Sequence, residues 1–109
     1  MRTIKIHLNE FRTTGSKVFT GRAKGVEVRE GSNIDQLEID NEEVTIVIPT
    51  DIYSINPSFL EEFLVNVVSK LGAAGFYAKF KFLNEGDYKI NKDLEEAVER
   101  ILRTENALV

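Results

Sequence analysis

Cysteine is absent from this chain of 109 residues, histidine occurs once and proline twice. The lack of cysteine excludes disulfides, thiolate nucleophiles and cysteine-based zinc sites, and it removes the usual mark of a small secreted domain. Long apolar runs are also missing, because charged residues interrupt the N-terminal segment and no later run reaches membrane-spanning length. We therefore expect a cytoplasmic protein without membrane insertion.

A basic stripe with interleaved aromatic residues is missing too, so nucleic acid is not an expected partner. The charges that are present separate by sign. Residues 1–30 carry seven basic and three acidic side chains, whereas residues 31–66 carry eight acidic and no basic ones. This asymmetry can steer a protein partner toward one face, although solvated acidic loops are the simpler interpretation. With 42% apolar residues and no repeat or linker, residues 1–109 are predicted to form a single domain.

Hydrophobic periodicity predicts six main elements in the order strand, helix, strand, helix, strand, helix. The predicted strands cover residues 3–8, 44–49 and 76–82, and the predicted helices cover residues 16–30, 57–71 and 91–104. The segment 16–30 also has a strand alternative, because Val26 and Val28 alternate as in a strand. A polar connection at 34–43 is expected to hold a short strand at Leu37 and Ile39. Strands that alternate with helices predict an α/β fold with parallel strand pairs and helices packed against the sheet.

The helix predicted at 57–71 begins in the stretch Asn56-Pro57-Ser58-Phe59 and is closed by Gly72. Two start positions compete. Asn56 can be the N-cap with Pro57 as the first helical residue, or Ser58 can be the N-cap with Glu61 reaching back in a capping box. Either position gives Ser58 a structural role worth roughly 1 kcal/mol.

The same helix carries apolar residues over nearly half of its circumference, which is wider than a single sheet face requires. The members of this apolar arc are Phe59, Leu60, Phe63, Leu64, Val67, Val68 and Leu71. The sequence leaves open whether a neighbouring helix or another protein molecule covers the arc. In the second case Asn56, Ser58, Phe59 and Glu62 are the candidate partner-binding or regulatory residues.

Other chemistry is sparse. Gly15 and Ser16, with Arg22 nearby, are candidate anion-binding residues, although the segment lacks the order of a phosphate loop and ordinary capping explains it more simply. His7 has no partner apparent in the sequence, and the carboxylates form no convincing acid/base pair or metal cluster. We therefore predict no catalytic residue, no metal and no cofactor.

One combination of motifs resembles a known family. The pattern F-x-G-R-x-x-G-x-x-V-R at residues 19–29, an isoleucine-rich strand, S-I-N-P-S-F at residues 54–59, a Leu-Gly helix end and an aromatic strand together resemble the STAS-like proteins of unknown function. These proteins are distant relatives of anti-sigma-factor antagonists. The resemblance runs from about residue 3 to residue 103. It implies a STAS-like α/β sandwich with a mixed sheet of about four strands, and a regulatory role without catalysis.

Antagonists of the wider superfamily carry a phosphorylatable serine in an Asp-Ser-Ser/Thr-Gly motif that opens the equivalent helix. This chain departs from that motif at Asn56, Pro57 and Phe59, and Ser58 matches only the second hydroxyl position. We therefore expect Ser58 to act in capping.

The resemblance implies an ATP-binding kinase or anti-sigma-like switch protein as the partner. The alternatives are a small-molecule or nucleotide-binding domain that uses Gly15, Ser16 and Arg22, and a structural homo-oligomer, such as a dimer, that buries the wide helix on itself.

Overall fold

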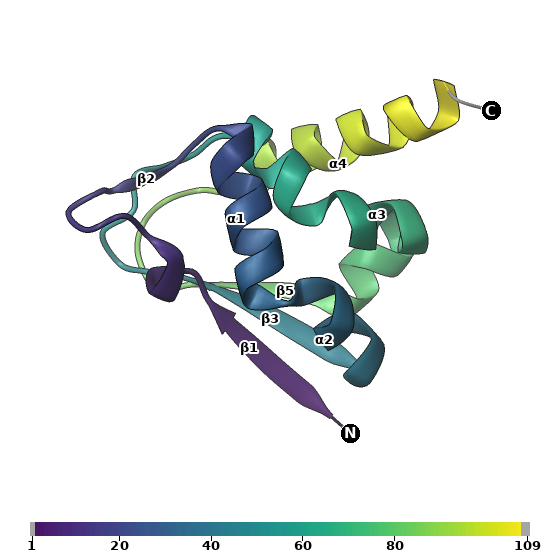
Figure 1. The fold of residues 1–109 in the computed structure, drawn as a ribbon, viewed down its shortest axis with the longest axis horizontal. Coiled ribbons are helices and arrows are strands. Elements are labelled where there is room, and N and C mark those ends of the chain that lie inside the picture. Colours follow the sequence, from purple (N-terminus) through teal and green to yellow (C-terminus); the bar gives the residue numbers. More distant parts are fainter. Residues whose placement is uncertain (1, 108–109) are drawn as a thin grey trace.

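The computed structural model describes residues 2–107, with side chains described through residue 104 (Figure 1). The strands are β1 (Thr3–His7), β2 (Val18–Phe19), β3 (Glu43–Ile48), β4 (Ser54–Ile55) and β5 (Phe80–Asn84). The helices are a short 3-10 helix η1 (Leu8–Phe11), α1 (Arg22–Ser32), α2 (Ile34–Asp40), α3 (Pro57–Lys79) and α4 (Asn91–Ala107). The predicted α/β class is confirmed.

Three parallel strands form the main sheet in the order β1-β3-β5. The register aligns Ile6 with Ile46 and Ile46 with Phe82, so that one face of the sheet is apolar across all three strands. On the other face Lys5 and Lys81 flank Thr45 in one row. Figure 1 shows the helices gathered on one side of this sheet, as right-handed crossovers between sequential parallel strands require.

The expected mixed sheet of about four strands is not what the described residues form. β2 and β4 pair with each other in a separate two-stranded parallel sheet, and every strand pair is parallel. The segment predicted as one helix at 16–30 is divided accordingly, since Val18 and Phe19 pair with Ser54 and Ile55 before α1 begins at Arg22. The coarser prediction of helices packed on a sheet with parallel pairs holds.

α3 lies at the centre of the molecule, with its most extensive helix contacts to α1 and α4 and with the sheet below it. Six of the seven members of the apolar arc are buried, and Leu71 is partly buried. The covering elements all belong to the same chain, so the arc is enclosed within one molecule. The predicted alternative of a helix wedged between sheet and neighbouring helices is therefore the correct one.

Gly72 interrupts α3 as the sequence predicted, with φ 73° and ψ 174°, a backbone conformation that is nearly restricted to glycine. The chain then re-enters a helix through Lys79. The strand predicted at 76–82 was therefore wrong in its first half, because Phe76 is helical and stacks on Phe80 with ring centroids 4.9 Å apart. The short strand predicted at Leu37 and Ile39 was also wrong, since both residues belong to α2.

Gly25 allows α1 to approach α3 closely. A Cβ atom at this position would lie 2.5 Å from the carbonyl oxygen of Phe59 and 2.7 Å from the Cβ of Glu62. The first of these is a backbone atom, so a side chain here would push the two helices apart. Gly25 lowers the helix propensity of α1, as the sequence indicated, and the structure shows that its missing side chain allows the two helices to pack closely.

We expect Gly25→Ala to lower the free energy of unfolding by about 1–3 kcal/mol, the usual cost of overpacking a core contact. Gly31→Ala in the same helix is the matched control. Its Cβ would meet only the ring of Phe11, at 3.1 Å, and Gly31 is exposed. The control should change stability by no more than about 1 kcal/mol in either direction. Urea denaturation of both variants measures the difference, and equal losses would contradict the proposed close contact.

Candidate functional site

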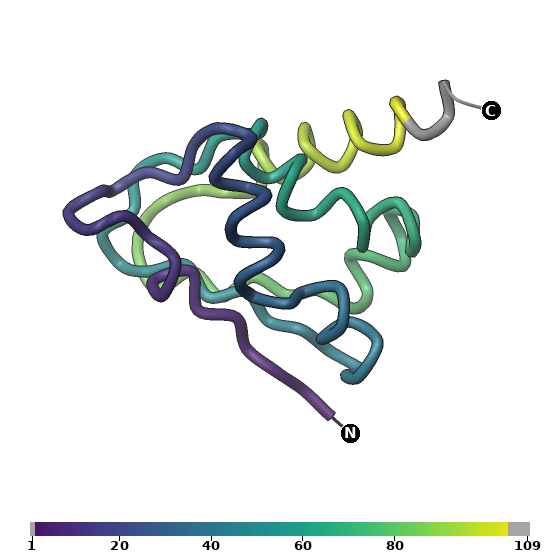
Figure 2. Tube along the Cα trace, viewed as in Figure 1, coloured from purple at the N-terminus to yellow at the C-terminus, as the bar shows by residue number. Residues whose placement is uncertain are grey.

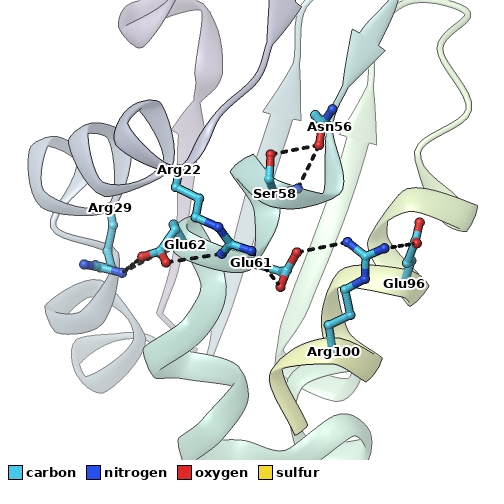
Figure 3. A network of polar contacts seen from close by, with 8 residues as sticks. All are labelled: Arg22, Arg29, Asn56, Ser58, Glu61, Glu62, Glu96 and Arg100. Atoms are coloured by element: carbon cyan, nitrogen blue, oxygen red, sulfur yellow. Dashed lines mark hydrogen bonds and ion pairs between the residues drawn. The ribbon is translucent and has the colours of Figure 1, made fainter. Parts of the chain in front are cut away.

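Asn56 caps the start of α3, with Pro57 as the first helical residue. The side-chain Oδ1 of Asn56 accepts two hydrogen bonds from Ser58, one from its backbone N–H at 2.9 Å and one from its hydroxyl at 2.8 Å (Figure 3). Of the two start positions that the sequence allowed, the Asn56 cap is therefore confirmed. Ser58 lies in the first turn, half-buried, with its hydroxyl proton directed at the cap.

Phe59 lies in the core, and its ring is fully buried against Phe19 and Phe63, at centroid distances of 5.2 and 5.7 Å. The prediction that placed Phe59 on a partner surface requires an exposed ring, so for this residue it needs correction. The apolar periodicity of α3 was read correctly, but the covering elements could not be seen in the sequence. Phe59 packs beneath the turn at residues 56–58 that opens α3, which we call the entry turn.

Four charged residues connect α1 to the first turns of α3. Arg29 donates a hydrogen bond to the backbone carbonyl of Glu62 at 2.5 Å and lies 3.5 Å from its carboxylate. Arg22 lies between two carboxylates, 3.5 Å from Glu62 and 3.7 Å from Glu61 (Figure 3). Glu62 was a candidate partner-binding residue, and the structure assigns its charge to two arginines of the same chain.

The row of charges continues from α3 to α4. Arg100 lies 3.3 Å from the carboxylate of Glu61 and 2.5 Å from that of Glu96 (Figure 3). Positive and negative side chains thus alternate from α1 through α3 to α4, and the two arginines beside Glu61 come from α1 and α4. This arrangement links α1 and α4 to the beginning of α3 and leaves little uncompensated charge there, with a small contribution to stability from each exposed pair.

The two motifs that carry the family resemblance meet at this place. Phe19 packs on Phe59, Gly25 lies against the backbone of Phe59, and Arg29 bonds to Glu62. The first motif therefore builds the support under the second. The two motifs are more than twenty residues apart in the sequence, and no local pattern indicates that they touch.

Gly15 and Ser16 lie in the turn ahead of β2, whereas Arg22 begins α1 after that strand. The Ser16 hydroxyl donates to the Val18 carbonyl at 3.1 Å and accepts from the Val18 N–H at 3.3 Å, and Gly15 has φ 79°. Arg12 closes this turn by donating to the carbonyl of Ser16. Among the described residues, the ion pairs of Arg22 are with Glu61 and Glu62. The structure therefore does not bring the three candidate anion-binding residues into one site.

A cleft of about 450 Å³ lies at the carboxyl ends of the three parallel strands. Its lining comes from the segments that follow β1, β3 and β5, and consists of His7, Asn9, Glu10, Pro49, Thr50, Asp51 and Glu85. This is the edge at which open α/β sheets commonly bind ligands. Nothing in the sequence indicated that these residues lie together, although each ends a strand or lies within three residues after one. His7 is exposed, as predicted for a surface strand residue.

Three further findings bear on function. Among residues 2–104, no three or more His, Asp or Glu side chains are grouped so that they would hold a metal ion. None of the helices described combines the length and the apolar character needed to cross a bilayer. Comparison with family models, with curated proteins and with solved structures found no match to this chain.

The paired arginines of α1 give a graded prediction. Arg29→Met removes a hydrogen bond from a largely buried guanidinium, whose side chain is 18% exposed, so we expect a loss of about 1–2 kcal/mol in unfolding free energy. Arg22→Met removes long contacts from a side chain that is 59% exposed and should cost about 0.5 kcal/mol or less. Guanidinium denaturation of both variants compares them, and a larger loss for Arg22→Met would refute this assignment.

Arg12, which closes the 12–16 turn, also pairs with Asp51, and this ion pair predicts that the stability of the protein depends on pH. The hydrogen bond from Arg12 is the main cause that lowers the pKa of Asp51 from its ordinary value. Because the folded-state pKa lies below the unfolded one, the ion pair stabilises the protein above about pH 3.9, and this contribution is lost as the pH falls further. An NMR titration should show the Asp51 pKa rising in Arg12→Gln. The free energy of unfolding of Asp51→Asn should fall less steeply than that of the parent as the pH is lowered. An unchanged pH dependence would argue against the pair.

Proposed function

We propose that this protein is a non-catalytic regulatory module of the STAS-like kind that binds a switch or kinase-type protein through the start of α3. The observation that carries the proposal is the entry turn of that helix. Its cap, its hydroxyl and its flanking charges are held in one geometry by contacts from α1, α4 and the core beneath. A surface so fixed loses little conformational entropy when a partner binds.

The proposed contact surface consists of Tyr53, Asn56 and Ser58. Tyr53 is 70% exposed and is the most exposed large hydrophobic side chain among the described residues. Its backbone N–H donates to the carbonyl of Lys17 at 3.0 Å, so the segment ahead of β4 lies beside the one ahead of β2 (Figure 2). Aromatic rings with little internal freedom are frequent anchors of protein interfaces. This surface differs from the apolar arc, which is enclosed and cannot serve a partner.

The class of partner follows from the family resemblance. The motif residues of 19–29 and 54–59 converge on this turn, so the residues that carry the resemblance include Asn56 and Ser58 of the proposed surface and the side chains that support them. In that family context the partner is an ATP-binding kinase or an anti-sigma-like switch protein. Regulation by charge at Ser58 is compatible with the geometry, because backbone N–H groups at a helix start favour an added negative charge.

The two alternatives have less support. A nucleotide site at Gly15, Ser16 and Arg22 would have to release the Ser16 hydroxyl from Val18 and Arg22 from its two glutamates. A small ligand is better accommodated by the cleft at the carboxyl ends of the strands. A homo-oligomer built on the wide helix has lost its motivation, because α1, α4 and the sheet already cover that helix.

The test is recovery of an ATP-binding protein by the tagged protein from its natural host. We expect Tyr53→Ala and Ser58→Glu each to lower this recovery at least about tenfold, a change of roughly 1.4 kcal/mol. A glutamate at position 58 suits the helix dipole, so the fold should be retained. Leu83→Ala is the matched control, since Leu83 is an exposed apolar residue on β5. Equal recovery by all four proteins, with their folding checked by circular dichroism, would reject the proposed surface.

A further inference from the structure

β1 is an edge strand with one side of its backbone open. It pairs with β3 through the five residues Thr3–His7, and no described strand lies on its other side (Figure 1). The carbonyl of Arg2 accepts from the N–H groups of Glu42 and Glu43. These bonds determine which residues of β1 direct their backbone groups toward β3. By the alternation of a parallel pair, Ile4 and Ile6 direct their amide groups to β3, while Thr3, Lys5 and His7 direct theirs outward.

A shallow groove accompanies this open edge on the side that faces the helices. Its volume is about 200 Å³, and its lining consists of Ile4, Lys5, Ile6, His7, Glu10, Phe11, Gly31, Ser32 and Leu37. Ile4 is 36% exposed although it belongs to the apolar face of the sheet, and Phe11 and Leu37 are only partly buried. The groove therefore offers apolar contacts beside unpaired backbone groups.

Of the devices that usually protect a sheet edge, β1 carries one, the charged side chain of Lys5. β1 contains no proline, and its Ile4 remains partly open to solvent. The charged side chain of the strand, Lys5, lies on the face away from the helices. An edge of this kind is a template for an added strand.

We propose that β1 binds an extended segment of another protein as a fourth strand of the sheet, and that this segment alternates apolar with acidic residues. The apolar side chains would enter the groove beside Ile4 and Leu37. Because side chains alternate between the faces of a strand, the intervening residues would lie on the other face beside Lys5, whose positive charge a carboxylate complements.

A second copy of this chain fits the edge less well. In the antiparallel arrangement that pairs all five residues of two β1 strands, Lys5 lies directly opposite Lys5 of the other copy, and like charges directly opposed are destabilising. The charge pattern of the edge thus favours a different, acidic strand over self-pairing.

The probe is the synthetic peptide acetyl-Thr-Val-Glu-Val-Glu-Val-Thr-amide, titrated into the isotope-labelled full chain and followed by NMR. We expect saturable shifts in β1 and around the groove, together with slower hydrogen exchange at the outward amides of Lys5 and His7. The amides of Ile4 and Ile6 already bond to β3 and should change little. The same peptide with lysine in place of glutamate should bind at least about tenfold more weakly, and one with a central proline should not bind.

Two variants separate the proposed site from non-specific binding. Ile4→Glu should weaken the peptide at least about tenfold, whereas Leu83→Glu on the other edge strand should bind like the parent. Lys5→Glu changes only an exposed charge and should reverse the preference toward the lysine peptide. The proposal is overturned if no shifts occur in β1, if Leu83→Glu loses binding as Ile4→Glu does, or if Lys5→Glu keeps the original preference. Concentration-dependent protection of the Lys5 and His7 amides without peptide would assign the edge to a second copy instead.

Discussion

The close approach of α1 to α3 at Gly25 is the constraint on which the rest of this fold depends. Without a side chain at that position the two helix backbones come near enough for Arg29 to reach the carbonyl of Glu62. α1 then covers one flank of α3 while α4 covers another and the sheet lies below. The apolar residues that cover nearly half of the circumference of α3 are buried because α1, α4 and the sheet enclose them.

A second constraint acts at the far end of the same helix. The carboxylate of Glu38 in α2 is almost completely buried and lies 3.2 Å from Lys70 and 3.6 Å from Lys79. These lysines belong to the two halves of α3, one before and one after the break at Gly72. A buried charge is costly unless it is paired, so α2 holds both halves in register with each other. The kink at Gly72 is thus bridged by ion pairs from Glu38 to one lysine on each side of it.

This arrangement explains what the sequence could and could not predict. β1 and β3 were found because their apolar residues alternate or run together, and α4 because its apolar stripe has a clear helical period. The segment 76–82 misled because Phe76 and Phe80 satisfy both periods, being an even number apart and also one helical turn apart. Only the register with β3, where Val44 pairs with Phe80, decides that the strand begins at 80.

α2 was missed for a related reason. Leu37 and Ile39 alternate as in a strand, but the residues that face inward are Ile34, Leu37 and Glu38, and the last is polar. Its burial depends on lysines more than thirty residues away, which no local pattern reveals. At the candidate site the Asn56 cap was one of two start positions that the sequence allowed, because Asn56 and Pro57 act locally. The burial of Phe59 and the neutralisation of Glu62 could not be predicted, because both depend on α1 folding back onto α3.

The enclosure of the apolar arc also changes what kind of binding surface the start of α3 can offer. An exposed apolar arc would favour permanent association, because water penalises it whenever the partner is absent. The surface that remains is a polar turn with one exposed aromatic ring, and the free protein can present it to solvent at little cost. Reversible binding needs such a surface, since both the bound and the free states must be stable. The ion pairs around Glu61 and Glu62 join the start of α3 to α1 and α4, so the proposed surface would need little ordering on binding.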